Sequence, residues 1–510
     1  MPGAPSVFDR LRHRLIVSCQ PVVDGPMDNS ASVVGFALAA EAGGAGALRI
    51  ESVAYLEAVR SVTSLPIIGI VKRHLSDSPV IITPLISDVE ALCRAGADIV
   101  AFDATVRQRP ASVAALVDAA HRGGKLTMAD CSSIEDAWAA LDAGVDCVGS
   151  TLSGYVGGQI PDEPDFALLG EMAKLSTFVI AEGRIKTLEH AAQALRLGAD
   201  AVVVGSAITR TEHLTGWYAD AIGQAARRKE GRALAIDIGG TKLLAALVQD
   251  GHVIDKRRLP TDRTVGPQGW IDALARAAGD WRGTYDAVGA AVTGIVDDGL
   301  WSALNRGTLD IPDDYPLQRQ LAAAFGTPAL ALNDAQAAAW GEYRFGAGEH
   351  ENMVFLTIST GLGGGIVLNG SLRSGLAGHY GILRGYGDDP ARPFEDGVAG
   401  RHFERAAAAS GHPGDAEAVF SAAAQGAHWA RDIIEQSARQ VAVLCQDIQL
   451  TLDPRRIVVG GGIGLAPGYL ASITAALPNL GPRLGVRLVP ARCGPRAGIV
   501  GVADLAFDAI

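Results

Sequence analysis

Two side chains that could carry protons stand at the ends of apolar runs in the first half of the sequence, Lys72 and Glu182. Burial disfavours a charged ammonium, so a lysine at the end of a buried strand is usable as a base or as a Schiff-base amine. A lysine and a carboxylate that face one another suit proton abstraction on one face of a carbon atom and delivery on the other. An ion pair of Lys72 with Glu51 or Asp103 is the structural alternative.

Two glycine-rich turns in the second half could hold nucleotide phosphates. The first, segment 237–242, has Asp237 before two glycines and Thr241 and Lys242 after them; the second is segment 359–365. Neither matches the G-x-x-x-x-G-K-[ST] phosphate loop. Glycines at such turns let backbone N–H groups approach phosphate oxygens, although a lone glycine turn is commonly only a hairpin. Two such turns beside an aspartate favour nucleotide phosphates and Mg²⁺.

Asn333 and Asp334 follow a short apolar strand and precede an alanine-rich helix. A residue of this type at this place commonly caps the helix. An aspartate here could also accept a proton from a sugar hydroxyl as that hydroxyl attacks the γ-phosphate. The motif alone leaves both roles open.

The elements that would position the first pair are repeated strand–helix units. We expect strands at residues 15–20, 47–51, 66–72, 98–103, 126–131, 146–151, 177–182 and 201–205. Eight such units in roughly 200 residues predict an α/β fold of the (β/α)8 type, the TIM barrel, whose active site gathers at the carboxyl ends of the strands.

The predicted strand ends are almost all polar, which favours a polar, hydroxylated substrate over a purely structural barrel. They are Gln20, Arg49 with Glu51, Lys72, Asp103, Asp130, Thr151, Glu182 with Arg184, and Gly205 with Ser206. The loops after strands seven and eight, with a helix start, form the usual phosphate site of this fold. Gly205 and Ser206 could equally be a tight turn with a serine cap, but Arg184 and the eight-unit context favour phosphate.

The pattern strand, glycine turn, strand occurs twice in the second half, at 234–258 and at 354–370. Such an internal duplication predicts two related lobes with a cleft between them. The charged, glycine-containing run 227–232 separates the two halves and indicates a linker. We therefore expect two domains, 1–229 and 230–510.

The 510-residue chain has 44 Lys and Arg against 56 Asp and Glu, mixed along its length, for a net charge of −12. Nucleic acids and anionic membranes require clustered basic residues, so we expect neither as a partner. The six cysteines are scattered without a C-x-x-C pair, and no stretch reaches the ~18 apolar residues of a membrane span. Because the first 20 residues lack the apolar core of a signal peptide, we expect a cytoplasmic protein.

Nine motifs in sequence order resemble the N-acetylmannosamine-6-phosphate 2-epimerases. They are residues 16–21, 25–28, 48–51, 68–73, 128–133, 151–155, 163–165, 181–184 and 204–210. The resemblance implies cofactor-free inversion at C2 of the open-chain sugar phosphate, with Lys72 and Glu182 as the acid/base pair. It implies substrate contacts at Gln20, Arg49, Asp130 and Arg210. A Schiff-base aldolase that uses Lys72 is the competing chemistry.

A second set of motifs, 237–242, 293–294, 333–334, 359–365 and 457–465, resembles the ROK family of sugar kinases, and 333–340 with 464–470 resembles its N-acetylmannosamine kinases. The resemblance implies a two-lobed actin-like, RNase H-like ATPase fold, the cofactors ATP and Mg²⁺, and Asp334 as catalytic base. The implied nucleotide contacts are Asp237, Gly239, Gly240, Thr241, Lys242, Thr360, Gly361, Gly363, Gly364, Gly460, Gly461 and Gly462. The implied sugar contacts are Gly294, Asn305, Asn333, His379 and Glu395.

The second half departs from the ROK pattern at a zinc cluster that many members carry. His379 and Ile382 occupy the place of a Glu-x-Gly-His motif, the stretch 383–394 holds no cysteine, and Glu395 follows it. Zinc is therefore not expected, because its thiolate ligands are missing. Ile382 cannot replace a hydrogen-bonding histidine, which puts sugar preference and kinase activity in question.

The two implied activities are consecutive, since the product of the kinase would be the substrate of the epimerase. Together they predict a bifunctional enzyme of sialic acid catabolism, with N-acetylmannosamine, its 6-phosphate and ATP as small-molecule partners. We expect a homodimer. An active epimerase fused to a weak sugar-sensing lobe, or a ROK kinase for another hexose, is the alternative. A repressor is disfavoured because the preceding segment is a barrel rather than a DNA-binding helix-turn-helix.

Overall fold

The computed structural model describes residues 6–304, 307, 309–385, 392–481 and 483–509. They fall into two compact units, Met1–Ala221 and Ile222–Ile510, each treated by itself below. The dividing point lies within helix α10 (Thr211–Glu230), so the charged run expected as a linker begins as the last turn of a helix. Arg228 of that turn pairs with Asp504 and Asp508. The boundary between residues 229 and 230 stays a prediction.

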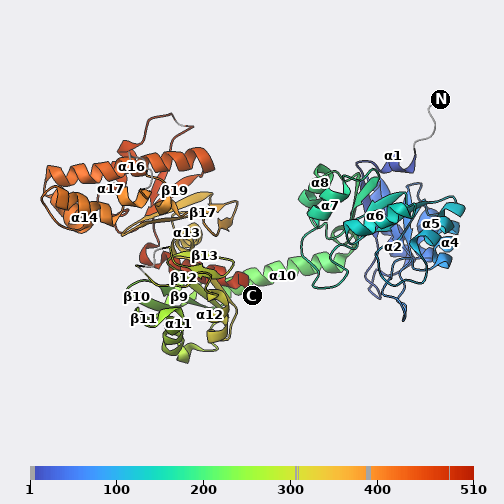
Figure 1. The fold of residues 1–510 in the computed structure, drawn as a ribbon, viewed down its shortest axis with the longest axis horizontal. Coiled ribbons are helices and arrows are strands. Elements are labelled where there is room, and N and C mark those ends of the chain that lie inside the picture. The colour runs from blue at the N-terminus through green and yellow to red at the C-terminus, as the bar shows by residue number, and fades with distance from the viewer. Residues whose placement is uncertain (1–5, 305–306, 308, 386–391, 482, 510) are drawn as a thin grey trace. The chain divides into compact units, whose positions relative to one another are not determined.

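The first unit is a closed barrel of eight parallel strands in the order β1 to β8, which confirms the predicted fold (Figure 1). The strands are β1 (Leu15–Cys19), β2 (Ala47–Glu51), β3 (Ile67–Ile70), β4 (Ile99–Asp103), β5 (Leu126–Asp130), β6 (Cys147–Gly149), β7 (Phe178–Ala181) and β8 (Ala201–Val204). Several are shorter than expected, so Gln20, Lys72, Thr151 and Glu182 stand just beyond strand ends rather than in them.

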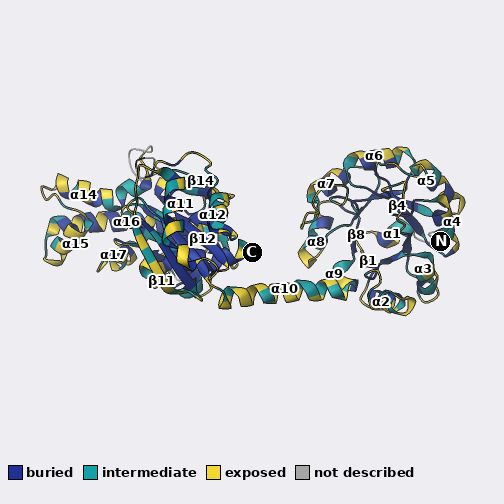
Figure 2. Ribbon diagram, turned by 90° about the horizontal axis from the view of Figure 1, so that it is seen from below, coloured by how far each residue is buried: buried dark blue, intermediate teal, exposed yellow. Residues whose placement is uncertain are grey.

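A ring of helices surrounds the strands (Figure 2). They are α2 (Ser30–Ala42), α3 (Val53–Arg60), α4 (Ile86–Arg94), α5 (Val113–Arg122), α6 (Ile134–Asp142), α7 (Phe166–Met172), α8 (Leu188–Arg196) and α9 (Ser206–Thr209). Most begin at a short polar residue that caps the first turn; Ser133 and Asp136 form a reciprocal capping box at α6. Such caps fix where each strand-to-helix loop ends.

The barrel has two apolar layers, one inside the strands and one between strands and helices. The short helix α1 (Val7–Leu11) belongs to the inner layer, because Leu11 is fully buried there and Phe8 stacks on Phe178 at 4.7 Å. Phe178 begins β7, so α1 closes the amino-terminal end of the barrel. The polar residues are left to the carboxyl end.

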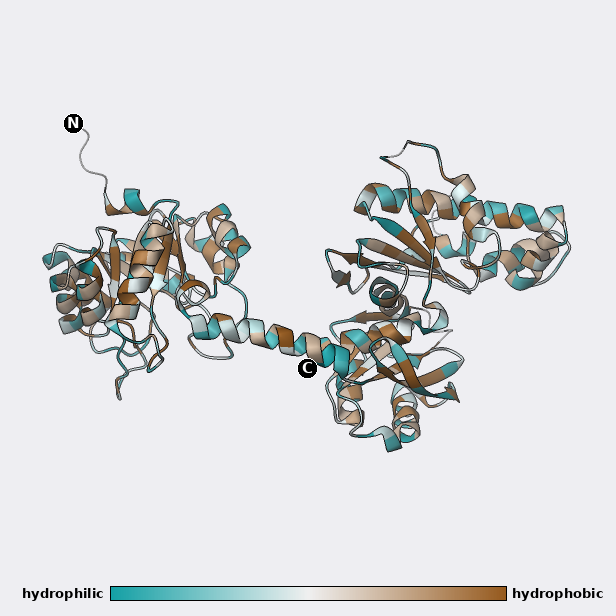
Figure 3. Cartoon of the chain, turned by 180° about the vertical axis from the view of Figure 1, so that it is seen from behind, coloured by the Kyte–Doolittle hydropathy of each residue, from teal (hydrophilic) through white to brown (hydrophobic). Residues whose placement is uncertain are grey.

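The second unit contains two five-stranded sheets of the same plan, which confirms the predicted duplication. The first is β11–β10–β9–β12–β15 and the second is β18–β17–β16–β19–β20; in each, three antiparallel strands are followed by two strands that run parallel to the third. Figure 3 shows apolar strands at the centre of each sheet. A small hairpin, β13 (Ile295–Asp297) and β14 (Leu300–Ser302), stands apart.

The strands of the first sheet are β9 (Ala233–Ile238), β10 (Lys242–Gln249), β11 (His252–Pro260), β12 (Ala287–Val292) and β15 (Ala329–Asn333). Those of the second are β16 (Met353–Ile358), β17 (Leu362–Leu368), β18 (Ser371–Arg373), β19 (Arg456–Gly460) and β20 (Leu488–Pro490). The helices are α11 (Gly266–Ala277), α12 (Leu317–Phe325), α13 (Asp334–Phe345), α14 (Gly400–Ala409), α15 (Ala416–Ala424), α16 (His428–Leu452), α17 (Tyr469–Ala476) and α18 (Ala497–Ala506). Short 3₁₀ turns include η2 (Tyr380–Ile382) and η3 (Phe394–Gly397). In the described part of the chain, no helix combines the length and apolar character that crossing a membrane requires.

Helices α13 and α18 cross at glycines. A Cβ on Gly501 would lie 1.9 Å from the Ala337 carbonyl oxygen, and one on Gly341 would lie 2.1 Å from that of Ala497. Such distances exclude any side chain, so the two backbones meet directly. This contact fixes α13, whose first residue is Asp334.

Candidate active sites

Arg49 joins two carboxylates at the mouth of the barrel. Its guanidinium reaches Asp130 through two nitrogens, at 2.6 and 3.2 Å, and Glu182 Oε2 at 2.9 Å. Thr151 Oγ1 lies 2.6 Å from Asp130 Oδ1 and 3.3 Å from Glu182 Oε2. Four strand ends, β2, β5, β6 and β7, thus meet in one buried charged cluster.

Burial raises the pKa of Glu182 to about 7; the attraction of Arg49 opposes this rise and the negative charge of Asp130 adds to it. The side chain is 13% exposed, so it still opens to the mouth. A carboxyl with this pKa takes up and releases a proton near neutral pH, as a general acid or base must.

Lys72 belongs to a second polar group beside the first. Its ammonium lies 2.7 Å from Gln20 Oε1 and 3.1 Å from Glu51 Oε2, and Gln20 is oriented by donating from Nε2 to Ser18 Oγ at 2.8 Å. Lys72 was expected at the end of a buried strand; its side chain is 29% exposed, and Glu51 supplies a counter-charge. The predicted ion pair with Glu51 is confirmed.

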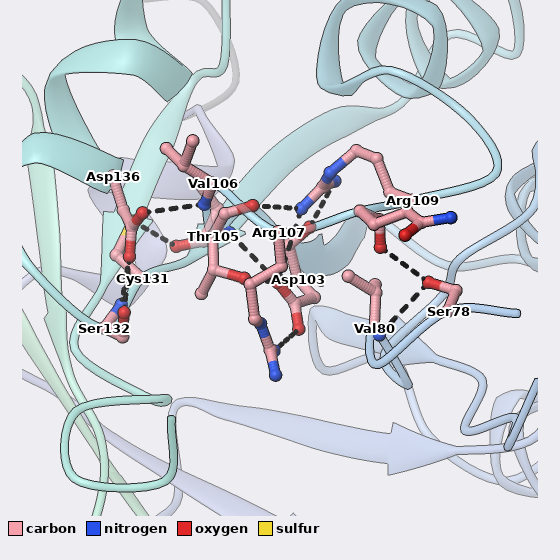
Figure 4. A network of polar contacts seen from close by, with 12 residues as sticks. Ser78, Val80, Asp103, Thr105, Val106, Arg107, Arg109, Cys131, Ser132 and Asp136 are labelled. Carbon is pink, nitrogen blue, oxygen red and sulfur yellow. Dashed lines mark hydrogen bonds and ion pairs between the residues drawn. The ribbon is translucent and has the colours of Figure 1, made fainter. Parts of the chain in front are cut away.

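The alternative partner, Asp103, turns away into its own loop (Figure 4). Its buried carboxylate accepts hydrogen bonds from Arg107 at 2.5 Å and Thr105 at 2.6 Å, and Arg109 lies at 3.4 Å. Asp103 therefore stabilises the loop after β4. Thr151, by contrast, was recognised only as a polar strand end, and Glu51 as a strand end and a structural partner of Lys72. Their contacts with Asp130 and Glu182, and with Lys72, place both in the site.

Among the residues predicted to hold phosphate, two lie at a helix start, and both arginines already donate to backbone carbonyls. Gly205 precedes the four-residue helix α9, which begins at Ser206. Arg210 donates from Nε to the Gln20 carbonyl at 2.9 Å. Arg184, with a positive φ of 57°, donates to the carbonyls of Glu163 and Ser153, so part of its guanidinium is already engaged by the preceding loop.

The second unit contains a cavity of about 750 Å³. Residues of both sheets line it, together with η2 and η3. Its lining includes the predicted residues Gly294, Asn333, Asp334, Thr360, Gly361, Gly363, Gly364, His379 and Glu395. Asn305 lies outside the described residues.

Asn333 and Asp334 divide the two roles that the sequence left open. Asn333 Oδ1 caps α13 by accepting from the N–H groups of Ala335 at 2.9 Å and Gln336 at 3.2 Å, and its Nδ2 donates to the Gly294 carbonyl at 2.8 Å. Asp334 lines the cavity, and its Oδ1 also accepts from the Ala335 N–H at 2.7 Å. Loss of water around it raises its pKa to about 6, and the nearby charge of Asp237 contributes.

Asp237 stands near the carboxyl end of β9, in register with Ala291 of β12, which in turn pairs with Leu332 of β15. Burial raises the pKa of Asp237, and Lys242 opposes that rise. The turn that follows is tight, with Gly239 N–H donating to the Lys242 carbonyl at 3.0 Å. The predicted hairpin is confirmed, although segment 237–242 is not part of the cavity lining.

Several glycines of the second half have a packing role. A Cβ on Gly363 would lie 2.9 Å from Ala335 Cβ and one on Gly365 2.5 Å from Ala339 Cβ, because α13 rests on β17. Gly461, at φ 87°, would place a Cβ 2.3 Å from the Ile358 carbonyl oxygen. A Cβ on Gly462 would meet open space. The glycines of these motifs are therefore explained in part by close packing, and only Gly462 among these four has open space beside it.

Two side chains of the cavity bear on sugar binding. Glu395 accepts from the Leu362 N–H at 3.2 Å and pairs with Arg401 at 3.3 Å. His379 Nε2 lies 3.4 Å from the Gly294 carbonyl, while its buried Nδ1 has no partner within the described chain. Ile382 lines the cavity beside them and offers only apolar surface.

Comparison with known proteins matches each half to a family. Residues 33–224 match the family described as "Putative N-acetylmannosamine-6-phosphate epimerase", and residues 233–509 match the ROK family. The solved N-acetylmannosamine-6-phosphate 2-epimerase of Clostridium perfringens is 41% identical, covering 43% of this chain and 98% of that one, with a TM-score of 0.42. A ROK family glucokinase from Streptomyces griseus, solved with glucose and AMPPNP, is 31% identical, covering 55% of this chain and 100% of that one, with a TM-score of 0.46.

Relatives from two Brucella species span both halves. The bifunctional enzyme NanE/NanK of Brucella melitensis biotype 1 is 50% identical over 504 residues, which are 98% of this chain and 97% of the relative. The order of the two matched families, an epimerase and then a ROK domain, agrees with the order of the two units. The chain belongs to the family of bifunctional NanE/NanK enzymes.

Proposed function

We propose that the second unit phosphorylates the 6-hydroxyl of N-acetylmannosamine with ATP, and that the barrel converts the product to N-acetylglucosamine 6-phosphate. The carrying observation is that Lys72 and Glu182 both stand at the carboxyl end of the barrel, near enough for the charge of Lys72 to act on the pKa of Glu182. Family membership along the whole chain supports the pairing of the two steps.

In the epimerase step, Lys72 and Glu182 would exchange the C2 proton on opposite faces of the open-chain sugar phosphate. The adjacent aldehyde carbonyl acidifies that proton, so side chains alone provide the chemistry. Arg49 holds Glu182 in place and stabilises its ionised form. Gln20 and Glu51 hold the Lys72 ammonium at the rim.

Proton exchange with solvent tests this step. N-acetylmannosamine 6-phosphate incubated with the enzyme in D₂O should give N-acetylglucosamine 6-phosphate with one deuterium at C2 and no carbon–carbon cleavage. Lys72→Met and Glu182→Gln should abolish turnover. Borohydride trapping of substrate on Lys72, with cleavage products, would support the Schiff-base aldolase instead.

In the kinase step, Asp334 would accept the proton of the sugar 6-hydroxyl, and Asn333 would hold the sugar from the neighbouring strand end. Bound ATP supplies the transferred γ-phosphoryl group, and Mg²⁺ neutralises its developing charge. Asp237 is close enough to Asp334 for its charge to raise the pKa of Asp334. Asp237 would hold the metal, and the turns after β9 and β16 would hold the phosphates.

ADP release measures this step. The full chain should release ADP with N-acetylmannosamine, Mg²⁺ and ATP, faster than with glucose or N-acetylglucosamine. Faster release with glucose would identify a ROK kinase for another hexose.

Ile382 supports a second candidate function, in which the second unit is a sugar-sensing lobe attached to an active epimerase. An apolar residue in the cavity offers no hydrogen bond to a hydroxyl. Absence of ADP release with every sugar, together with saturable N-acetylmannosamine binding by calorimetry, would favour that function.

We further propose a cytoplasmic homodimer with a domain boundary between residues 229 and 230. Sedimentation should give twice the mass of the chain, and cell fractionation should recover the protein with cytoplasmic enzymes. A monomeric sedimentation profile would contradict the assembly. Fragments 1–229 and 230–510, expressed separately, should each retain one activity.

A further inference from the structure

The chain leaves β3 and returns to the barrel through a short excursion that surrounds Lys72. We call residues 71–83 the strand-end hairpin. Lys72 pairs with Ile82 in an antiparallel bridge, and the N–H of Arg73 donates to the Ile81 carbonyl at 2.9 Å. Lys72 therefore projects from the strand-end hairpin, which is held by backbone pairing, rather than from a free loop.

Thr83 closes this hairpin in an unusual conformation. It is fully buried and has a φ of 46°, and it is the one β-branched residue at positive φ in the described part of the chain. A β-branched side chain in the left-handed region is strained, because its branch meets the backbone. Strain of this type persists only where the surrounding contacts impose it, and it concentrates at functional sites.

Three hydrogen bonds impose the positive φ of Thr83. The Thr83 N–H donates to the Val71 carbonyl at 2.6 Å, and the Val71 N–H donates to Thr83 Oγ1 at 3.1 Å. Thr83 Oγ1 donates in turn to the Ala101 carbonyl of β4 at 2.7 Å. Both backbone groups of Val71, the residue before Lys72, are thus bonded to Thr83.

The hydroxyl stands where the direct pairing of β3 and β4 has stopped. These strands are in register only at Ile68 with Ile99 and Gly69 with Val100. Beyond that point the Thr83 hydroxyl bridges Val71 and Ala101, and the Asp103 N–H donates to the Ile82 carbonyl at 3.0 Å. The strands separate at the mouth, and Thr83 fills the gap with buried hydrogen bonds.

The outer end of the hairpin is tied to the loop after β4 (Figure 4). Ser78 Oγ donates to the Gln108 carbonyl at 2.8 Å, and that loop is held by Arg107 and Arg109 on the buried Asp103. The hairpin is thereby anchored at its tip and at its base. Thr83 is the anchor nearest to Lys72.

We propose that Thr83 is a positioning residue for the epimerase reaction, whose hydroxyl fixes the backbone of Val71 and so sets the place of the Lys72 ammonium. The proposal rests on the proposed role of Lys72. Thr83 touches no reacting atom; it acts by keeping Lys72 against Gln20 and Glu51 at the rim of the site. Small displacements of a proton-transfer group lower turnover steeply.

Thr83→Val tests the proposal, because it keeps the branched shape and removes the hydroxyl. The kcat for deuterium exchange at C2 should fall about tenfold or more. The KM should change by less than about twofold, since the substrate contacts remain. Thr83→Ser should retain turnover within about twofold. ADP release by the second unit of the same chain should be unchanged, which controls for concentration and for folding of that unit.

Lysine labelling reads the position of Lys72 independently of the reaction. Pulse labelling with an amine-reactive ester, followed by peptide mass spectrometry, should modify Lys72 several-fold faster in Thr83→Val than in the parent, and the exposed Lys174 at the parent rate. Unchanged Lys72 labelling overturns the proposal whatever the turnover. Retained exchange in Lys72→Met would instead reject the proposed catalytic role, and labelling would still decide the positioning. If Thr83→Val does not fold, Thr83→Cys provides the same comparison.

Discussion

Asn333 caps helix α13 with its side-chain oxygen, and by doing so leaves the adjacent carboxylate of Asp334 facing the cavity. A single N-cap position needs only one such side chain. Asp334 Oδ1 also accepts from the Ala335 N–H at 2.7 Å, so this carboxylate contributes to the cap while it lines the cavity. The two substitutions should therefore have different effects.

Asp334→Asn should lower kinase kcat by about 10²–10⁴-fold, because the proton acceptor is lost. Stability should change little, since Asn333 still caps the helix. Asn333→Ala should destabilise the second unit by about 1 kcal/mol and weaken sugar binding. ADP release and urea unfolding of both variants provide the test. Unchanged turnover in Asp334→Asn would show that Asp334 is not the catalytic base.

Kinase activity should fall as the pH drops through about 6. The base must be ionised, and the pKa of Asp334 is raised to about 6 by loss of water and by Asp237. Activity is therefore present above that pH and lost below it. Initial rates of ADP release at saturating ATP, from pH 5 to 8, provide the profile. A profile flat to pH 5 would contradict this.

Arg49→Met should destabilise the barrel by about 3–5 kcal/mol, because Asp130 and Glu182 would remain buried without a cation. The matched control is Arg12→Met, whose pair with Asp200 is half exposed on the arginine side and should contribute about 0–1 kcal/mol. Urea unfolding followed by circular dichroism compares the two. Similar losses would show that the cluster at the mouth has no special stabilising role.

Glu182 should make the barrel less stable as pH rises. Its pKa is about 7 in the folded protein against an ordinary 4.5, so the folded state holds the proton more tightly. The stabilisation from proton binding is complete below about pH 4.5 and is lost as the pH rises through 7. Glu182→Gln should flatten this dependence in thermal unfolding from pH 5 to 8. An unchanged slope would mean that Glu182 titrates at its ordinary value.

Gly501→Ala should lower the stability of the second unit by about 1–3 kcal/mol, because the new Cβ would overlap the Ala337 carbonyl. It should also lower kcat for the kinase, since α13 carries Asp334 at its start. Gly498→Ala in the same helix is the control, because a Cβ there would lie 3.5 Å from the nearest atom, an ordinary contact. Equal effects of both alanines would reject the close-packing explanation.

Much of the fold was predictable because it depends on local patterns. Eight apolar runs of strand length with helical runs between them indicated the barrel, and two repeats of strand, glycine turn and strand indicated the paired sheets. The pairing of side chains was not predictable in the same way. Lys72 could have met Glu51 or Asp103, and only the direction in which each strand end turns selects Glu51. Thr83 gave no signal, because its role depends on a positive φ and on contacts with two strands.

The sequence by itself determined the two folds, their order and the set of polar residues at strand ends, since strand length, alternation with helices and glycine turns are written into neighbouring residues. The tertiary structure decided which of those residues meet. Burial raised the pKa of Glu182 beside Asp130, and Lys72 gained a counter-charge from a separate strand. Asn333 and Asp334 separated into cap and candidate base. Those outcomes follow from distances between residues far apart along the chain, which no local pattern contains.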